Sequence, residues 1–248
     1  MSASIAGTAG LLRNISKGSA DEDLARLATD LANEVDTGIR EWGVVTHSTG
    51  SKVFAMEVDG FGNFFFGDDA NVPSLLALPF YGYIDASDPL YLATRKLLLS
   101  NRTNPYFYGC GSPDDGCGFL GGIGSEDASG NAGLGRVWGL SLCTRLLTVA
   151  GDSEAADAER LAILRTVVMA SGGTGLMHES YWFEDSSVYT RFWFAVSRNQ
   201  PLPALYISSF LGPEPVFCCT QMANSYMGMV LLDLAETRPH LLFTEDSL

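Results

Sequence analysis

The chain has 248 residues, of which 46% are hydrophobic, so it holds enough apolar material for the core of one large domain or of two small ones. Its 15 basic and 29 acidic residues give a formal charge of −14. Nucleic acids and anionic membrane surfaces bind cationic faces, so this charge argues against both as partners and leaves neutral ligands. The sequence shows neither a signal peptide nor an apolar run long enough to span a membrane, and it indicates no compartment.

The first third of the chain predicts a helix, a hairpin and a second helix. Residues 21–42 predict an amphipathic helix, because apolar side chains recur at steps of three and four at Leu24, Leu27, Leu31, Val35 and Ile39. Residues 44–47 and 52–58 flank a Ser-Thr-Gly-Ser turn and predict a short β-hairpin. Residues 72–83 predict a helix with Pro73 in its first turn, which would set the preceding acidic loop at a helix N-terminus.

The rest of the chain predicts more helices around a glycine-rich stretch. Residues 89–100, 136–150, 153–170 and 222–234 predict helices, and residues 187–195 begin a further core element. Residues 109–135 contain ten glycines, which indicates a long loop or a mobile lid. No Gly-Lys-Ser or Gly-Lys-Thr follows, so a phosphate-binding loop is not supported. Residues 174–180 predict a tight connection that presents Glu179.

The chain contains five cysteines, an odd number that leaves at least one thiol unpaired. Their spacing fits neither a complete disulfide framework nor a zinc site. Cys110 and Cys117 could close a small loop in an oxidising compartment, although free cysteines are the simpler interpretation.

Residues 174–195 combine groups that suit carbohydrate chemistry. Glu179 could transfer a proton, and three further side chains could hold or stack on a sugar, namely His178, Arg191 and Trp193. Each of these three also has a purely structural interpretation. His178 could be a satisfied turn histidine, Arg191 could pair with Asp185, and Trp193 could be a core residue.

A second polar segment places hydrogen-bonding groups among glycines and aromatic residues, at Asp68, Asp69 and Asn71. Its Asp-Asp-Ala-Asn-Val-Pro-Ser-Leu-Leu block, followed later by Gly-Ile-Gly-Ser and Met-His-Glu-Ser, resembles glycoside hydrolase family 125, the exo-acting alpha-1,6-mannosidases. The resemblance implies an all-α fold, an (α/α)6 toroid, and a metal-independent inverting mechanism without a cofactor. It also implies a mannose-containing glycan as ligand, with Glu179 as general base and the other named residues holding the sugar. The chain departs from the family at Glu126-Asp127, where Pro-His is usual.

The family's general acid belongs to a Phe-Arg-Pro-Ser-Asp-Asp block, which does not occur in these 248 residues. Asp114 and Asp115 follow a Ser-Pro pair, but they stand between blocks that belong after the acid, so neither is its counterpart. We therefore expect residues 1–248 to form a single partial catalytic domain, about the second half of a toroid with a short hairpin and with some helix faces exposed. A noncatalytic carbohydrate-binding remnant and a nonfunctional fragment stay open as alternatives, as does the oligomeric state.

Residues 196–221 interrupt the resemblance. They contain prolines and a pair of adjacent cysteines and show no periodicity, whereas the family passes directly from Trp-Phe-Ala to a closing helix that here begins near Met222. We expect this segment to be an insertion that arises from a retained intron or a similar artefact of the gene model. A genuine surface insertion is the alternative, because loops tolerate added length at little thermodynamic cost.

Overall fold

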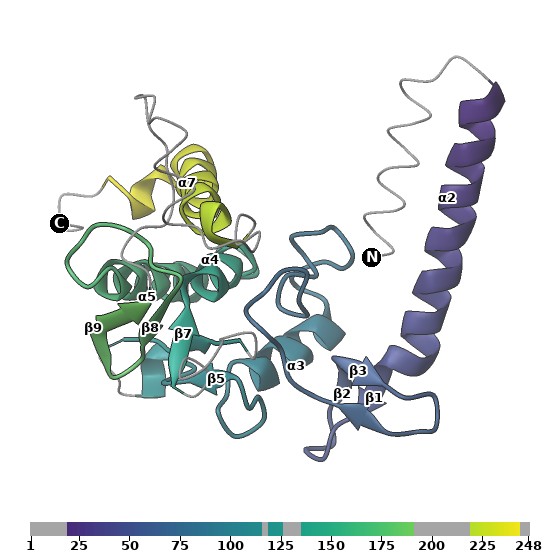
Figure 1. Ribbon diagram of the computed structural model, residues 1–248, viewed down its shortest axis with the longest axis horizontal. Helices are drawn as coiled ribbons and strands as arrows, with labels where there is room; N and C mark the ends of the chain where they lie inside the picture. The colour runs from purple at the N-terminus through teal and green to yellow at the C-terminus, as the bar shows by residue number, and fades with distance from the viewer. Residues whose placement is uncertain (1–18, 116–118, 126–134, 191–218, 244–248) are drawn as a thin grey trace, which may run out of the picture. The chain divides into compact units, whose positions relative to one another are not determined.

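The computed structural model describes residues 19–115, 119–125, 135–190 and 219–243, drawn as coloured ribbon in Figure 1. Contacts divide the chain into two compact units. The first unit runs to Asp68 and includes Val72–Leu98 and Arg102–Pro105. The second unit comprises Asp69–Asn71, Leu99–Asn101 and the chain from Tyr106 onward. Each unit has its own arrangement of helices and strands and is described by itself.

The first unit begins with helix α2, Ser19–Gly38, which continues as the π-helix η1, Ile39–Gly43. This confirms the helix predicted at 21–42. Strand β1, Val44–Thr46, pairs with β2, Lys52–Phe54, so the predicted hairpin forms as well. The chain then folds into a second, separate hairpin of β3, Glu57–Val58, and β4, Phe64–Phe65.

Helix α3, Pro89–Leu98, completes the first unit where the sequence predicted a helix. The Asp88 carboxylate accepts a hydrogen bond of 2.7 Å from the backbone N–H of Leu90 and so satisfies one of the free donors of the first turn. On the buried face of α3, the Thr94 hydroxyl accepts a 3.0 Å bond from the Phe54 amide of β2. The Thr94 side chain thus holds the β1–β2 hairpin against α3.

The helix predicted at 72–83 is wrong: the segment is a series of turns. Pro79 has no N–H and cannot continue a ladder of i to i−4 bonds. Most backbone bonds of the segment instead join residues three apart, such as 3.2 Å from Ala77 N to Ser74 O and 2.9 Å from Gly82 N to Pro79 O. The acidic loop that precedes this segment therefore does not lie at a helix N-terminus.

The second unit contains a small hairpin and a three-stranded antiparallel sheet. Strand β5, Phe107–Tyr108, pairs with β6, Gly122–Ile123, around the 3-10 turn η2, Pro113–Asp115. The sheet has the order β7-β8-β9, with bounds Arg136–Trp138, Ser180–Trp182 and Asp185–Thr190. The helix predicted at 136–150 therefore begins only after a strand.

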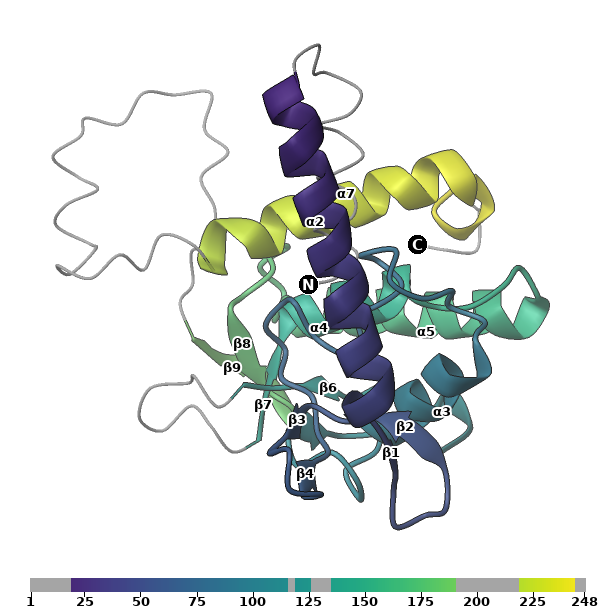
Figure 2. The same ribbon diagram turned by 90° about the vertical axis from the view of Figure 1, so that its right-hand side faces the viewer.

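Three helices and a terminal turn pack with these strands: α4, Gly139–Leu147; α5, Glu154–Ala170; α7, Cys219–Thr237; and η3, Pro239–Leu241. Figure 2 shows α7 on one side of α4 and β6 and β7 on the other, and Figure 1 shows the same for α7 and β7. Buried residues extend along α4 from Gly139 to Leu146, as expected of a helix covered on every side. The core includes Val137, Leu142, Ile163, Tyr181 and Val230.

The expectation of an all-α fold is wrong. The described residues contain five α-helices and also nine strands in four antiparallel sheets. Within the glycine-rich stretch, Gly122–Ile123 forms strand β6 and several glycines lie against neighbouring backbone, whereas residues 116–118 and 126–134 of the predicted loop lie outside the described residues. A Cβ on Gly121 would lie 2.1 Å from the Tyr108 carbonyl oxygen, and one on Gly124 would lie 2.2 Å from the Arg136 carbonyl oxygen. These glycines allow neighbouring backbones to approach each other.

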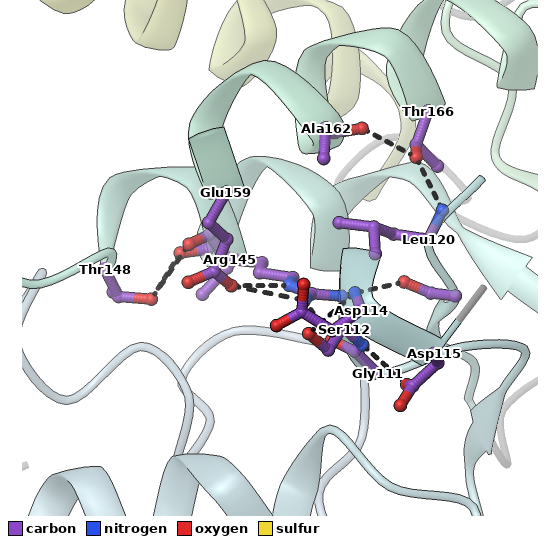
Figure 3. Close-up of polar contacts among 12 residues, drawn as sticks. Gly111, Ser112, Asp114, Asp115, Leu120, Arg145, Thr148, Glu159, Ala162 and Thr166 are labelled. Carbon is purple, nitrogen blue, oxygen red and sulfur yellow. Dashed lines mark hydrogen bonds and ion pairs between the residues drawn. The ribbon is translucent and has the colours of Figure 1, made fainter. Parts of the chain in front are cut away.

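The buried side chain of Arg145 links the β5–β6 hairpin to helices α4 and α5 (Figure 3). Arg145 of α4 is 1% exposed and donates to the backbone oxygens of Gly111 and, at 3.3 Å, Gly121. Its Nε and Nη2 also bond Glu159 of α5 at 3.3 and 3.2 Å. Nearby, the Thr166 hydroxyl of α5 accepts a 3.0 Å bond from the Leu120 amide. Two helices and both arms of the hairpin are therefore joined by charge-assisted and neutral hydrogen bonds.

Two further observations concern the described part of the chain. Cys143 is a free, buried thiol whose pKa is raised to about 12 by burial, whereas Cys110 is disulfide-bonded, contrary to the simpler expectation of free cysteines. No helix in the described ranges combines the length and the apolar character that crossing a bilayer requires.

Candidate functional site

Glu179 lies at the end of a tight turn, as the sequence predicted. Turn bonds such as 3.0 Å from Gly172 N to Met169 O and 3.0 Å from Thr174 N to Ser171 O reverse the chain after α5. Glu179 then immediately precedes β8 and is half-buried. The Thr190 hydroxyl of β9 donates to Glu179 Oε2 at 3.2 Å. A carboxylate accepts several hydrogen bonds, so this contact orients the group and leaves it able to bind a water molecule.

His178 is buried just before the glutamate, with 2% of its surface exposed. Its ring lies parallel to that of Tyr189, with centroids 3.7 Å apart and planes 3° apart. Its Nε2 lies 3.0 Å from the Ser171 carbonyl oxygen and 3.1 Å from the Thr174 hydroxyl. The imidazole therefore holds together the turn that presents Glu179.

Asp69 and Asn71 of the second unit both form hydrogen bonds with the hydroxyl of Ser125, which follows strand β6. Asp69 accepts 2.7 Å bonds from the Asn71 amide and from the Ser125 hydroxyl. The Asn71 side-chain amide donates to the same hydroxyl at 3.0 Å, and the Ala70 N–H donates to the Gly124 carbonyl at 2.9 Å. Asp69 and Asn71 are half-buried, whereas Ser125 is 2% exposed. The result is a fixed group of a carboxylate, an amide and a hydroxyl.

Asp68 belongs to the first unit and has a different environment. It is 2% exposed, and its two carboxylate oxygens accept backbone bonds of 2.8 Å from Leu75 and 2.9 Å from Leu76. Its own amide donates to Asn104 at 3.2 Å. This carboxylate organises the backbone of the turns that follow it.

The β8–β9 hairpin contains two groups with shifted pKa values. Hydrogen bonds from the Ser187 hydroxyl, at 2.6 Å, and from the Ser187 amide, at 3.0 Å, lower the pKa of Asp185 below its ordinary value. Burial raises the pKa of Tyr181, which extends from β8 into the core. Asp185 therefore stays ionised and caps the turn, and Tyr181 stays neutral.

Two of the residues expected to bind sugar, Arg191 and Trp193, lie outside the described residues, as does segment 196–221. Trp182, half-buried in β8, donates from its indole nitrogen to Glu184 at 3.4 Å. Within the described ranges, no three histidine, cysteine, aspartate or glutamate side chains group as metal ligands.

Sequence reasoning missed three hydroxyls beside the candidate acids: Ser125, Ser180 and Thr190. The Ser180 hydroxyl lies 2.7 Å from that of Thr190, which in turn bonds Glu179. Ser125 and Ser180 end the Gly-Ile-Gly-Ser and Met-His-Glu-Ser blocks, so their position in the quoted motifs was the available signal. Thr190 had no such signal, because only the β8–β9 pairing reveals its contact with Glu179.

Comparisons with known proteins identify what this chain resembles. The model of a family described as metal-independent alpha-mannosidases (GH125) matches residues 1–200. The Meiotically up-regulated gene 157 protein of Schizosaccharomyces pombe is 35% identical over 231 residues, which are 93% of this chain and 37% of that protein. A solved Streptococcus pneumoniae metal-independent alpha mannosidase, in a non-productive substrate complex with alpha-1,6-mannobiose, is 29% identical with a TM-score of 0.70. That match covers 96% of this chain and 46% of the solved one. The chain thus spans less than half of either relative.

Proposed function

The chain belongs to the GH125 family of metal-independent alpha-mannosidases, and from this membership we propose that it contributes the water-activating side of an exo-acting alpha-1,6-mannosidase site. The observation that carries the proposal is the placement of Glu179. This half-buried carboxylate follows a turn closed by His178 and accepts a 3.2 Å hydrogen bond from Thr190. The alpha-1,6-mannobiose bound by the solved relative supports the substrate class.

In the proposed reaction, Glu179 acts as the general base of an inverting hydrolysis. It takes a proton from a water molecule, whose oxygen attacks the anomeric carbon on the face opposite the leaving group. The bond to the leaving oxygen breaks, and a general acid protonates that oxygen. Inverting glycosidases hold the two carboxyl groups about 6.5–9.5 Å apart to admit the water. A half-buried base suits this role, because water reaches it while the protein fixes its orientation.

The group formed by Asp69 and Asn71 is proposed to hold hydroxyls of the terminal mannose. Ser125 keeps the carboxylate and the amide in place through bonds of 2.7 and 3.0 Å. Charged and amide groups fixed in this way bind a hydroxyl without first losing side-chain freedom. His178, whose Nε2 lies 3.0 Å from a backbone oxygen, would support the site indirectly, whereas the carboxylate of Asp68 accepts bonds from the backbone of its own unit. Arg191 and Trp193 remain proposed sugar contacts on the resemblance alone.

The test compares the wild-type chain with the Glu179→Gln variant on an aryl alpha-mannoside whose leaving group is a weak base. Such a substrate needs little protonation, and it is chosen because these 248 residues contain no Phe-Arg-Pro-Ser-Asp-Asp block. Loss of a general base costs about 10²- to 10⁴-fold in kcat. The control is Glu184→Gln, which makes the same chemical change at an exposed position of the β8–β9 turn and should leave kcat unchanged.

Titration with alpha-1,6-mannobiose separates catalysis from binding alone. Binding with no turnover of the aryl mannoside would favour a noncatalytic carbohydrate-binding protein. Equal turnover by wild type and by Glu179→Gln would rule out the proposed base.

A further inference from the structure

We propose that Thr190 and Ser180 form a hydroxyl relay that sets the orientation of the Glu179 carboxylate, so both are positioning residues for the base. This inference rests on the proposed function of Glu179. It concerns a different question, namely what fixes the direction in which the base presents its oxygens.

The direction of the hydrogen bonds follows from the chemistry of the groups. An ionised carboxylate only accepts, so the Thr190 hydroxyl must use its single proton in the 3.2 Å bond to Glu179 Oε2. The oxygen of Thr190 can then only accept from the Ser180 hydroxyl, which lies 2.7 Å away. The proton order is therefore Ser180 to Thr190 to Glu179. The Ser180 carbonyl is a weaker competitor for the Thr190 proton, because it lies 3.4 Å away.

The sheet holds this relay in register. Ser180 of β8 pairs directly with Thr190 of β9, so their side chains stand on the same face as cross-strand neighbours. On its other side Ser180 pairs with Trp138 of β7, which makes β8 the central strand. Ser180 is 1% exposed, so its hydroxyl is shielded from water that would otherwise compete for the bond. The pairing of β8 with β9 thus holds both hydroxyls beside Glu179, the residue that immediately precedes β8.

The arrangement predicts an effect on the chemical step with little effect on binding. Glu179 must aim one oxygen at water in the transition state, whereas the proposed sugar contacts of Asp69 and Asn71 involve other side chains. Loss of the Thr190 proton should therefore lower kcat and leave KM nearly unchanged. The expected loss is on the order of 10- to 100-fold, the worth of one hydrogen bond to a charged group.

The experiment measures kcat and KM on the activated aryl alpha-mannoside for four variants of the full chain. Thr190→Val removes the hydroxyl but keeps the β-branched shape that a strand favours. Thr190→Ser restores the hydroxyl and should restore most of kcat. Ser180→Ala removes the second donor and should give a smaller loss than Thr190→Val. Ser187→Ala, which removes a hydroxyl of the same hairpin that bonds Asp185 rather than Glu179, is the control and should match wild type.

Each outcome decides the inference. A lower kcat for Thr190→Val with KM within about twofold, together with rescue by Thr190→Ser, supports the relay. Equal kcat for Thr190→Val and wild type overturns it. Equal losses in Thr190→Val and Thr190→Ser, accompanied by lower melting temperatures, would show a structural role instead. If wild type and Glu179→Gln turn over the substrate equally, the proposed function fails and this inference fails with it, a result that the threonine variants alone could not produce.

Discussion

Replacement of Arg145 by methionine should destabilise the protein strongly, because this guanidinium is 1% exposed and bonds three separate groups. Breaking a buried ion pair by removing one partner costs about 3–5 kcal/mol. The Glu159 side chain is 23% exposed, so water can solvate it in the variant and reduce its share. The carbonyls of Gly111 and Gly121 would still lose their donors, at about 1–3 kcal/mol for each buried group. We expect a loss of about 3–4 kcal/mol, a large part of the roughly 5–15 kcal/mol typical of a domain.

Urea unfolding followed by far-ultraviolet circular dichroism measures this loss, provided that the m-value is unchanged. Glu159→Gln is the matched variant. It keeps an amide oxygen as acceptor at the more exposed end of the pair, so its cost should be smaller, about 1–2 kcal/mol. The double variant then gives the coupling energy between the two side chains. A loss below about 1 kcal/mol for Arg145→Met would refute the view that this arginine fastens the hairpin to α4 and α5.

Two further predictions concern close packing and pH. Gly121→Ala should lower the melting temperature sharply, because the added Cβ would lie 2.1 Å from a backbone oxygen. Gly228→Ala in α7, where an added Cβ would have nothing within 4 Å, should instead raise the free energy of unfolding by about 0.5–1 kcal/mol. Similar effects of the two substitutions would contradict the packing argument. A hydrogen bond from His240 and then a pair with Arg160 hold the pKa of Asp157 below its ordinary 3.8. The stability that this carboxylate contributes is therefore present above pH 3.8 and is lost as the pH falls through the lower folded-state pKa. The unfolding free energy of Asp157→Asn should therefore fall less steeply on acidification than that of wild type, as measured by urea titrations between about pH 5 and pH 2. An equal slope for the two proteins would contradict this.

Helices with clear periodicity could be predicted from the sequence, because apolar side chains that recur at steps of three and four indicate a helix. The helices α2, α3 and α5 form as predicted, and Ser153 caps the first turn of α5 by accepting a 3.2 Å bond from the Ala156 amide. The stripe did not identify the buried face of α2, where Leu24, Leu27 and Leu31 are exposed while Ala25 and Ala32 are buried. The helix predicted at 72–83 does not form. The prediction rested on the apolar pattern alone, whereas Pro79 lacks the backbone N–H that a helix interior needs.

The strands of the second unit were missed because they are short and because the partner of β7 is distant in sequence. Arg136–Trp138 continues without a break into α4, so its residues read as the first turn of a helix. Its partner strand β8 begins at Ser180, and only that pairing makes the segment extended. The glycines of the β5–β6 hairpin likewise indicated a loop, because a sequence does not show which backbone a missing side chain lets approach.

In the candidate site too, local features could be predicted from the sequence and contacts between distant residues could not. The turn that presents Glu179 was predictable from its glycines and from the quoted motif, because both are local. The contacts of Asp69 with Ser125 and of Glu179 with Thr190 join positions 56 and 11 residues apart and depend on how the hairpin and the sheet form. Which polar residues bond backbone and which meet a ligand was therefore not decided by residue type.

The most direct test of Glu179 as the water-activating base is azide rescue of Glu179→Ala. Azide is anionic and needs no deprotonation, so it can occupy the space of the missing carboxylate and attack the anomeric carbon of the aryl alpha-mannoside. The aryl oxide then leaves with the bonding electrons. If the account holds, the variant is inactive in buffer, and azide restores turnover with beta-mannosyl azide as the product, identified by proton NMR. Full activity of Glu179→Ala without azide, or formation of alpha-mannosyl azide, would contradict it.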